Sequence, residues 1–297
     1  TAQMYRAYHA IRDLTGPDGK ATNAVFGFVT MLRKLINDHQ PALIAAAFDL
    51  RGPTFRSEID ASYKANRPPM PDDLSEQVAW VHEACQALGV PVLTHERFEA
   101  DDVIGTLAKR ALENELEVVI VTGDKDFFQL VQPHVRIFNP RDQGIWYDAD
   151  AVKVKFGVNP DQVVDVLALM GDAVDNVKGV PGIGEKGARE LITKFGSLDT
   201  LLKQPEDVEK TRYRSALAQH AEEAQISREL VTIRTDVPVP FDLKALRYQG
   251  PLSERCFALF SSLGFRKLLS DYAPTVAVVE KDYEVVRTKS DLSTLVE

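Results

Sequence analysis

The sequence contains few cysteines, no long apolar run and no internal repeat. Its two cysteines, Cys85 and Cys256, lie far apart with no His or Cys at metal-ligand spacing. This pattern excludes a thiolate zinc site and a disulfide framework, and it fits a reducing cytosol. No apolar run approaches the roughly 20 residues that span a bilayer, and the first six residues lack the apolar core of a signal peptide. We therefore expect a cytoplasmic protein with no membrane partner.

Basic residues are fewer than acidic ones: the chain has 35 Lys and Arg and 44 Asp and Glu, which gives a net charge of −9. Proteins that bind nucleic acid usually have a basic surface, so the net charge alone argues against such a partner. The acids are clustered, however. If eight of them belong to one metal site, the rest of the chain is nearly neutral and has room for local basic stripes. Net charge therefore does not decide the partner.

The length of 297 residues and the 44% hydrophobic content are typical of a globular protein of about two domains. In residues 1–150, short apolar runs at 43–48, 91–94 and 118–122 alternate with helical patterns at 74–88 and from Ala100 onward. This alternation predicts an α/β domain with a central, mostly parallel sheet flanked by helices. Residues 151–273 read as helices at 151–156, 161–170, 184–195, 212–219 and 222–233, which predicts a helical subdomain.

Two segments depart from these patterns. Residues 50–72 contain four prolines and several basic residues, and non-periodic stretches of this length are often functional. Residues 274–297 return to strand-like patterns at 276–279 and 283–286. We expect this tail to be a linker and the first elements of a further domain, so that the chain is a fragment.

Acidic residues follow the apolar runs of the first domain. Asp49 ends the first run, Glu99, Asp101 and Asp102 follow the second after a short loop, and Asp124 and Asp126 directly follow the third. Ligands bind at the carboxyl ends of the strands in such sheets. A further pair, Asp172 and Asp175, follows the predicted helix 161–170. Clustered oxygen ligands suit hard divalent cations such as Mg²⁺, and two such ions can drive phosphodiester hydrolysis.

Each cluster also has a plain structural interpretation. Asp101 and Asp102 suit a helix N-terminus, Asp124 and Asp126 suit a cap, and Asp172 and Asp175 suit a turn. That these three clusters and Asp49 are all structural is less expected than one shared metal site.

A glycine-rich turn, 178–188, begins three residues after Asp175. Gly182 and Gly184 allow a tight turn with positive φ, and the exposed amides of the helix that follows can hold a backbone phosphate without reading bases. The pattern is that of a helix-hairpin-helix flanked by Lys178, Lys186 and Arg189. No Gly-Lys-Ser/Thr ends it, so it is not a P-loop.

Together, these motifs resemble the 5′-nuclease (5′→3′ exonuclease) domain of bacterial DNA polymerase I, in the flap endonuclease superfamily. The resemblance runs from about Tyr5 to Ala273. It is carried by residues 5–10, Phe48-Asp49, Phe55-Arg56, residues 63–67, 99–102, 122–126, and 171–176 running into 179–184.

The resemblance implies a PIN-like 5′-nuclease fold and cleavage of DNA at 5′ flaps, nicks, junctions and RNA primers, as in replication and repair. It implies two Mg²⁺ or Mn²⁺ ions, a monomer, and a place in the bacterial cytoplasm and nucleoid. The implied metal site comprises Asp49, Glu99, Asp101, Asp102, Asp124, Asp126, Asp172 and Asp175, not all of which need contact a metal.

The same resemblance assigns roles to residues outside the acidic clusters. Arg56 and Lys64 would grip the scissile phosphate from a helical arch formed by residues 50–72, and Tyr5, beside Arg6, would stack on a displaced base near the active site. The turn would hold duplex DNA, often with a K⁺ ion, through Lys178, Gly179, Gly182, Gly184, Lys186 and Arg189, with Arg67 a further DNA contact from the arch.

One departure from the family leaves the activity open. The family has its first metal-site aspartate six residues before the tyrosine that Tyr5 matches, a position that precedes Thr1. An alternative is therefore a junction-binding module with little activity. A third interpretation, a phosphatase of small phosphate esters, explains neither the glycine turn nor the basic arch.

Overall fold

The computed structural model describes residues 1–141 and 144–273, and the predicted start of a further domain at 274–297 lies outside the described residues. Within the described part, no helix is long and apolar enough to cross a membrane. The fold is mixed α/β, as predicted. The helices of the first half are α1 (Ala2–Ala10), α2 (Asn23–His39), α3 (Phe55–Ile59), α4 (Asp72–Ala87) and α5 (Ala100–Glu113).

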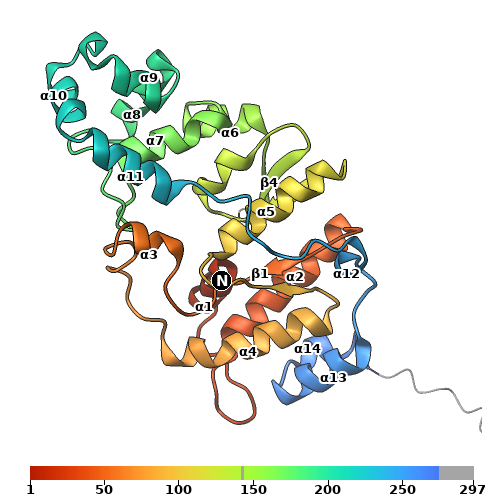
Figure 1. Cartoon of the computed structure of the whole chain (residues 1–297). Coiled ribbons are helices and arrows are strands. Elements are labelled where there is room, and N and C mark those ends of the chain that lie inside the picture. Colours follow the sequence, from red (N-terminus) through yellow and green to blue (C-terminus); the bar gives the residue numbers. More distant parts are fainter. Residues whose placement is uncertain (142–143, 274–297) are drawn as a thin grey trace, which may run out of the picture.

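The strands form two small sheets (Figure 1). In one, β1 (Ala46–Ala47) pairs in parallel with β2 (Val92–Leu93). In the other, β3 (Val118–Val121) pairs in parallel with β4 (Val135–Asn139), and β5 (Ile145–Tyr147) is antiparallel to β4. The three strands expected from apolar runs are present, but they are short and divided between two sheets rather than joined in one central sheet.

The second half of the chain is helical, as its patterns predict. It begins with α6 (Ala149–Phe156), capped by Asp148, whose side chain accepts from the amide of Ala151, and ended by Gly157 at φ 87°. The further elements are η2 (Pro160–Gln162), α7 (Val163–Met170), α8 (Glu185–Phe195), α9 (Leu198–Lys203), η3 (Pro205–Asp207), α10 (Thr211–Gln219), α11 (Ala221–Val231), α12 (Leu243–Leu246), α13 (Ser253–Ser262) and α14 (Arg266–Leu269). A short 3₁₀ helix, η1 (Lys125–Leu130), follows β3.

The molecule has two large hydrophobic cores, and their boundary does not follow the division of the chain into residues 1–150 and 151–273. One core joins β3–β5 to α6, α7, α8 and α11, with Ile120, Ile137 and Leu167 among its buried members. The other joins α1, α2 and α4 to α13 and α14. The carboxylate-bearing segments lie where these two cores meet, and helix α5 runs between them (Figure 1).

The last described helices pack back on the first half of the chain. Cys256 and Phe260 of α13 are fully buried in the same core as Val81 and Cys85 of α4. The predicted helical subdomain 151–273 is therefore not a single packing unit, because its residues from 253 onward complete the core of the first domain. The apolar pattern of α13 predicts burial but does not indicate which surface buries it.

The arch region contains one short helix, α3, followed by turns at 61–66. The prolines that flank this region explain its limited regular structure, since proline removes an amide donor and fixes φ. Hydrogen bonds from Lys64 N to Asp175 O (2.9 Å) and from Asn176 Nδ2 to Ser62 O (2.7 Å) attach the arch to the loop before the glycine turn.

Candidate metal and nucleic-acid site

Three of the acidic positions lie where parallel strands end, as the strand–acid pattern predicts. Asp49 follows β1, and its Oδ1 accepts from the amide of Ala100 at the start of α5 (2.9 Å). Glu99 is the N-cap of α5. Asp124 caps η1 directly after β3, accepting from the amide of Asp126 (3.0 Å). The acids that follow the strands of the two sheets therefore lie close to one another.

The loop after α7 supplies the remaining pair. Gly171 ends α7 at φ 71°, a conformation that glycine adopts without strain. Beyond it, the backbones of Asp172 and Val177 pair with each other, and Asp172 Oδ1 accepts from the amide of Val174 (2.7 Å). This local turn holds Asp172 and Asp175 toward the other acids.

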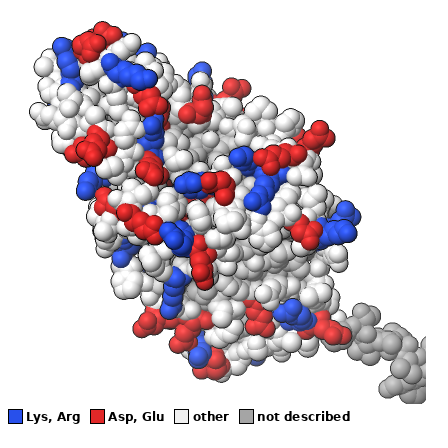
Figure 2. Space-filling view, viewed as in Figure 1, with Lys and Arg blue, Asp and Glu red and all other residues white. Residues whose placement is uncertain are grey.

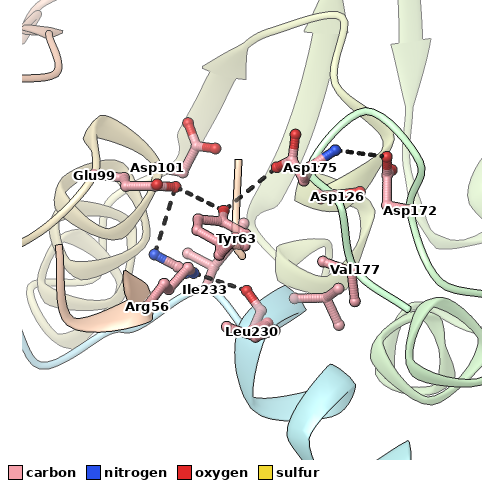
Figure 3. Close-up of a pocket in the computed structure, with 11 residues that line it drawn as sticks. Arg56, Tyr63, Glu99, Asp101, Asp126, Asp172, Asp175, Val177, Leu230 and Ile233 are labelled. Atoms are coloured by element: carbon pink, nitrogen blue, oxygen red, sulfur yellow. Dashed lines mark hydrogen bonds and ion pairs between the residues drawn. The ribbon is translucent and has the colours of Figure 1, made fainter. Parts of the chain in front are cut away.

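The acids line a common cavity (Figure 3). Its polar walls are Glu99 and Asp101 on one side and Asp126, Asp172 and Asp175 on the other, and Tyr63 and Arg56 also line it. Its floor is apolar and includes Val177, Leu230 and Ile233. The structure therefore brings together the side chains of five acids predicted to form one site, from segments up to 76 residues apart in sequence.

Besides Arg56, whose Nη1 lies 3.6 Å from Glu99 Oε2, three basic side chains pair with these acids. Lys64 Nζ lies 2.7 Å from Glu99 Oε2 and 3.6 Å from Asp175 Oδ2. Arg67 also pairs with Asp175, and Lys125 Nζ lies 2.9 Å from Asp172 Oδ2. Lys125 was not expected at the site, although it lies between Asp124 and Asp126 in the sequence. These pairs offset part of the repulsion among the carboxylates.

The repulsion that remains shows in the pKa values. Burial, together with the charges of Asp124, Asp49 and Glu99, raises the pKa of Asp101 to about 7. Burial and the neighbouring Asp124 likewise raise the pKa of Asp126 well above its usual range. Asp172 behaves differently: burial opposes its ionisation, but the hydrogen bond and charge of Lys125 outweigh it, so its pKa is lowered.

The donor set suits a hard divalent cation. Every polar group on the two acidic walls is a carboxylate oxygen, the ligand type that Mg²⁺ and Mn²⁺ prefer. Asp126 Oδ1 is buried without a hydrogen-bond partner, which is costly unless something else satisfies it. Across residues 1–141 and 144–273, however, no three acidic, His or Cys side chains converge tightly enough to form a preassembled metal site. The acids fit a metal centre but are not drawn together into one.

Arg56 and Asp102 have other partners than the resemblance implies. Arg56 is 2% exposed and Asp102 is fully buried, and they form a two-pronged ion pair with Nη1–Oδ2 2.7 Å and Nη2–Oδ1 2.8 Å. The expected roles, a phosphate grip for Arg56 and a place in the metal site for Asp102, require groups that face the substrate or the metal. Here both groups face each other inside the protein, and of the two only Arg56 also lines the cavity.

Tyr5 and Arg6 do not line the cavity as the structure describes it. The ring of Tyr5 lies partly buried against the core of α2 and α4 and stacks on His9, and Arg6 donates to Gln3 (2.8 Å). Tyr63, in contrast, lies between the acids. Its hydroxyl is 3.2 Å from Glu99 Oε2 and 3.3 Å from Asp175 Oδ2, and burial with the nearby negative charges raises its pKa.

The glycine turn has the positive φ that its sequence predicts at Gly182 but not at Gly184, whose φ is −89°. Gly179 and Gly182 have φ values of 63° and 84°. A Cβ on Gly179 would lie 2.4 Å from the amide nitrogen of Gly171, so the turn packs directly against the end of α7. Gly184 is the N-cap of α8 and would hold a Cβ in open space. The space beside Gly184 at the start of α8 is therefore open.

The basic residues around the turn differ in their freedom. Lys178 lies 3.5 Å from Asp60 of the arch, and Arg189 pairs with Glu185 within α8, whereas Lys186 is exposed. Arg212 of α10, missed from the sequence, donates to the carbonyl of Gly182 (3.2 Å). Figure 2 shows basic and acidic side chains interleaved on the face that it presents, without a continuous basic stripe.

Comparison with known proteins places the chain among nucleases. Residues 1–157 match the family model "5′-3′ exonuclease, N-terminal resolvase-like domain", and residues 158–254 match "5′-3′ exonuclease, C-terminal SAM fold". The chain therefore belongs to the 5′-3′ exonuclease family.

Among its relatives are DNA polymerases I. The chain is 43% identical over 305 residues to DNA polymerase I of Pseudomonas aeruginosa, an alignment that covers 96% of this chain and 33% of the relative. It is 38% identical over 268 residues to thermostable DNA polymerase I of Thermus aquaticus, covering 90% of this chain and 32% of the relative. The chain thus spans about a third of the length of these curated relatives.

Solved structures share the fold at low sequence identity. T5 5′-exonuclease with bound zinc has a TM-score of 0.67 at 21% identity, covering 91% of this chain and 93% of that one. The catalytic core of Rad2 in complex with DNA substrate has a TM-score of 0.57 at 17% identity, covering 92% and 90%. The resemblance found in the sequence is confirmed at the level of family and fold.

Proposed function

We propose that this chain is a structure-specific 5′ nuclease that hydrolyses DNA phosphodiesters at 5′ flaps, nicks and primer ends with two divalent ions, Mg²⁺ or Mn²⁺. The observation that carries the proposal is the common cavity, where five carboxylates face one another beneath the basic arch. Membership in the 5′-3′ exonuclease family supports it, as do the metal bound to T5 5′-exonuclease and the DNA substrate bound to the Rad2 core.

The carboxylates of the cavity, together with the nearby Asp49 and Asp124, would hold the ions, and Asp101 and Asp126 would give up their protons as the metals bind. Two divalent ions in such a site activate a water and stabilise the leaving oxygen of a phosphodiester. Lys64 and Arg67 already lie on the arch side of the acids, so their cationic groups are positioned to meet the scissile phosphate. Tyr63 keeps Glu99 and Asp175 on opposite sides of its hydroxyl.

The glycine turn would bind the duplex through backbone phosphates. The open space beside Gly184 at the start of α8 and the exposed Lys186 support this role, and neither a backbone amide nor Lys186 reads a base there. A K⁺ ion at the turn, action on RNA primers and a monomeric state belong to the same proposal and rest on the family resemblance.

The test compares cleavage of a 5′-flap DNA with cleavage of a generic phosphate monoester, both with Mg²⁺. Flap cleavage without ester hydrolysis is the expected result. Binding without cleavage would favour the junction-binding module, and ester hydrolysis would favour the phosphatase. Because the resemblance implies a further aspartate before Thr1, the assay is repeated on a longer chain that includes it. Equal rates at low Mg²⁺ would show that this aspartate is dispensable.

A further inference from the structure

The buried pair Arg56–Asp102 uses almost all the hydrogen-bonding capacity of both side chains. Asp102 Oδ2 accepts from Arg56 Nη1 and from the amide of Glu99 (3.0 Å), and Oδ1 accepts from Arg56 Nη2 and from the amide of Arg234 (2.9 Å). Each carboxylate oxygen therefore has two donors within the protein. A metal could reach this carboxylate only by displacing them.

Arg56 is engaged to a similar extent. Besides its two bonds to Asp102, its Nε donates to Leu230 O (2.7 Å) and its Nη2 to Thr232 O (2.8 Å). Four of its five N–H groups thus have partners inside the protein. A direct grip on a phosphate would require Arg56 to leave a carboxylate and two carbonyls that are also buried, which is strongly unfavourable.

The pair joins three parts of the chain. Arg56 lies on α3 of the arch, Asp102 lies in the first turn of α5, and the carbonyls and amide that complete the network belong to residues 230–234 at the end of α11. Glu99 and Asp101, which carry one acidic wall, stand on the same turn as Asp102. Arg56 Nη1 is itself 3.6 Å from Glu99 Oε2.

We propose that Arg56 and Asp102 are positioning residues, which together fix the first turn of α5 so that Glu99 and Asp101 face the metal ions. This proposal rests on the nuclease function proposed above and removes both residues from the groups that contact phosphate or metal. The two-pronged geometry gives the pair its directional character, because a guanidinium and a carboxylate lock each other's orientation. Residues that hydrogen-bond to metal ligands typically change metal affinity by about 10–100-fold.

The experiment measures Mn²⁺ affinity, DNA affinity without metal, and Tm for Arg56→Gln, Asp102→Asn and the double variant. Both single variants should weaken Mn²⁺ binding by a similar factor, about 10–100-fold. The double variant should be little worse than the worse single one, because the two residues act as a unit. Affinity for flap DNA without metal should stay within about twofold of wild type. If Arg56→Gln does not fold, Arg56→Lys keeps the charge without the two-pronged geometry and should still weaken Mn²⁺ binding.

A matched control lies on the same helix. Glu58 of α3 pairs with Arg97 at 2.8 Å, with both side chains more than 60% exposed. Glu58→Gln and Arg97→Gln should leave Mn²⁺ affinity unchanged.

Three results would each overturn the proposal. Loss of Mn²⁺ affinity in Asp102→Asn alone would make Asp102 a direct ligand, and loss of DNA affinity in Arg56→Gln alone would make Arg56 a phosphate contact. Folded variants with normal Mn²⁺ affinity would leave the pair a purely structural role. Failure of wild type to cleave flap DNA would instead reject the nuclease function, and the Mn²⁺ measurement would still decide the role of the pair.

Discussion

The carboxylate site and the glycine turn are built in opposite ways. The site collects side chains from several segments, and its geometry depends on contacts such as Arg56–Asp102 between residues far apart in sequence. The turn is a local backbone structure set by a few glycines, Gly182 at φ 84° among them. A single side-chain change should therefore disable the site without altering the fold, whereas the turn should respond to changes that block its backbone.

The largest effect is expected at the acidic cavity. Asp172→Asn removes a carboxylate whose lowered pKa keeps it ionised. Flap cleavage should fall more than about 100-fold, because loss of a direct metal ligand costs more than loss of a residue that only positions a ligand. Tm should be nearly unchanged. The control is Asp38→Asn, which removes an exposed acid paired with Lys34 on α2. A wild-type cleavage rate in Asp172→Asn, or in Asp124→Ala, would remove that residue from the proposed metal site.

A smaller effect is expected at the turn. The Cβ that Gly184→Val introduces has no protein atom within 4 Å, but it lies in the path of a bound phosphate. Duplex affinity should therefore fall roughly tenfold, about 1.4 kcal/mol. Gly184→Ala should give an intermediate loss, and Tm should hold in both. Adding Gly182→Val should weaken binding further, because its φ of 84° and the nearby Arg212 strain any side chain. Unchanged affinity in the double variant would make the turn a structural hairpin only.

The pH dependence of stability tests the carboxylate site. The pKa of Asp101 is raised to about 7 in the folded protein, so between about pH 4 and pH 7 the folded state holds a proton that the unfolded state releases. Stability of the metal-free protein should therefore fall as pH rises through this range, by up to about 1.4 kcal/mol per pH unit for each such proton. Asp126 acts in the same direction, whereas Asp172, with its lowered pKa, stays ionised throughout.

Thermal unfolding between pH 5 and pH 8 measures this slope. Asp101→Asn should flatten it, and Mg²⁺ should raise Tm most at the high-pH end, where the acids are ionised. A metal-free Tm that rises steadily to pH 8 would contradict the assigned repulsion.

The smallest effect concerns the salt dependence of duplex binding. Lys186 is exposed beside the turn, and Lys186→Gln should reduce the slope of log affinity against log salt by about 0.9, the loss of one phosphate contact. Lys267→Gln, on the surface of α14, removes the same positive charge far from the turn and serves as a control for net charge. An identical slope in Lys186→Gln and wild type would exclude this lysine from the interface.

The sequence predicts local features of this protein well. The acids after apolar runs, the cap of α5 and the positive φ values of the turn all follow from residue types and short spacings. Even the plain interpretation of Asp102 as a helix-start residue proves relevant, because its side chain accepts from the amide of Glu99 (3.0 Å).

What the sequence does not predict depends on long-range packing. Arg56 and Asp102 are 46 residues apart, and nothing local indicates that they meet. The return of α13 to the core of α4 likewise depends on which apolar faces fit together, and periodicity reports only that such a face exists. The division of the strands between two sheets is a third feature of this kind.

The most direct test of the account is the number of Mn²⁺ ions that the chain holds with flap DNA bound. Titration of the complex, followed by the loss of the free-ion electron paramagnetic resonance signal, gives this number at equilibrium. The account predicts two ions per chain for wild type, and weakened or lost binding of at least one of them in Asp172→Asn. Fewer than two ions in wild type, or an unchanged titration in Asp172→Asn, would contradict the claim that these carboxylates form a two-metal nuclease site.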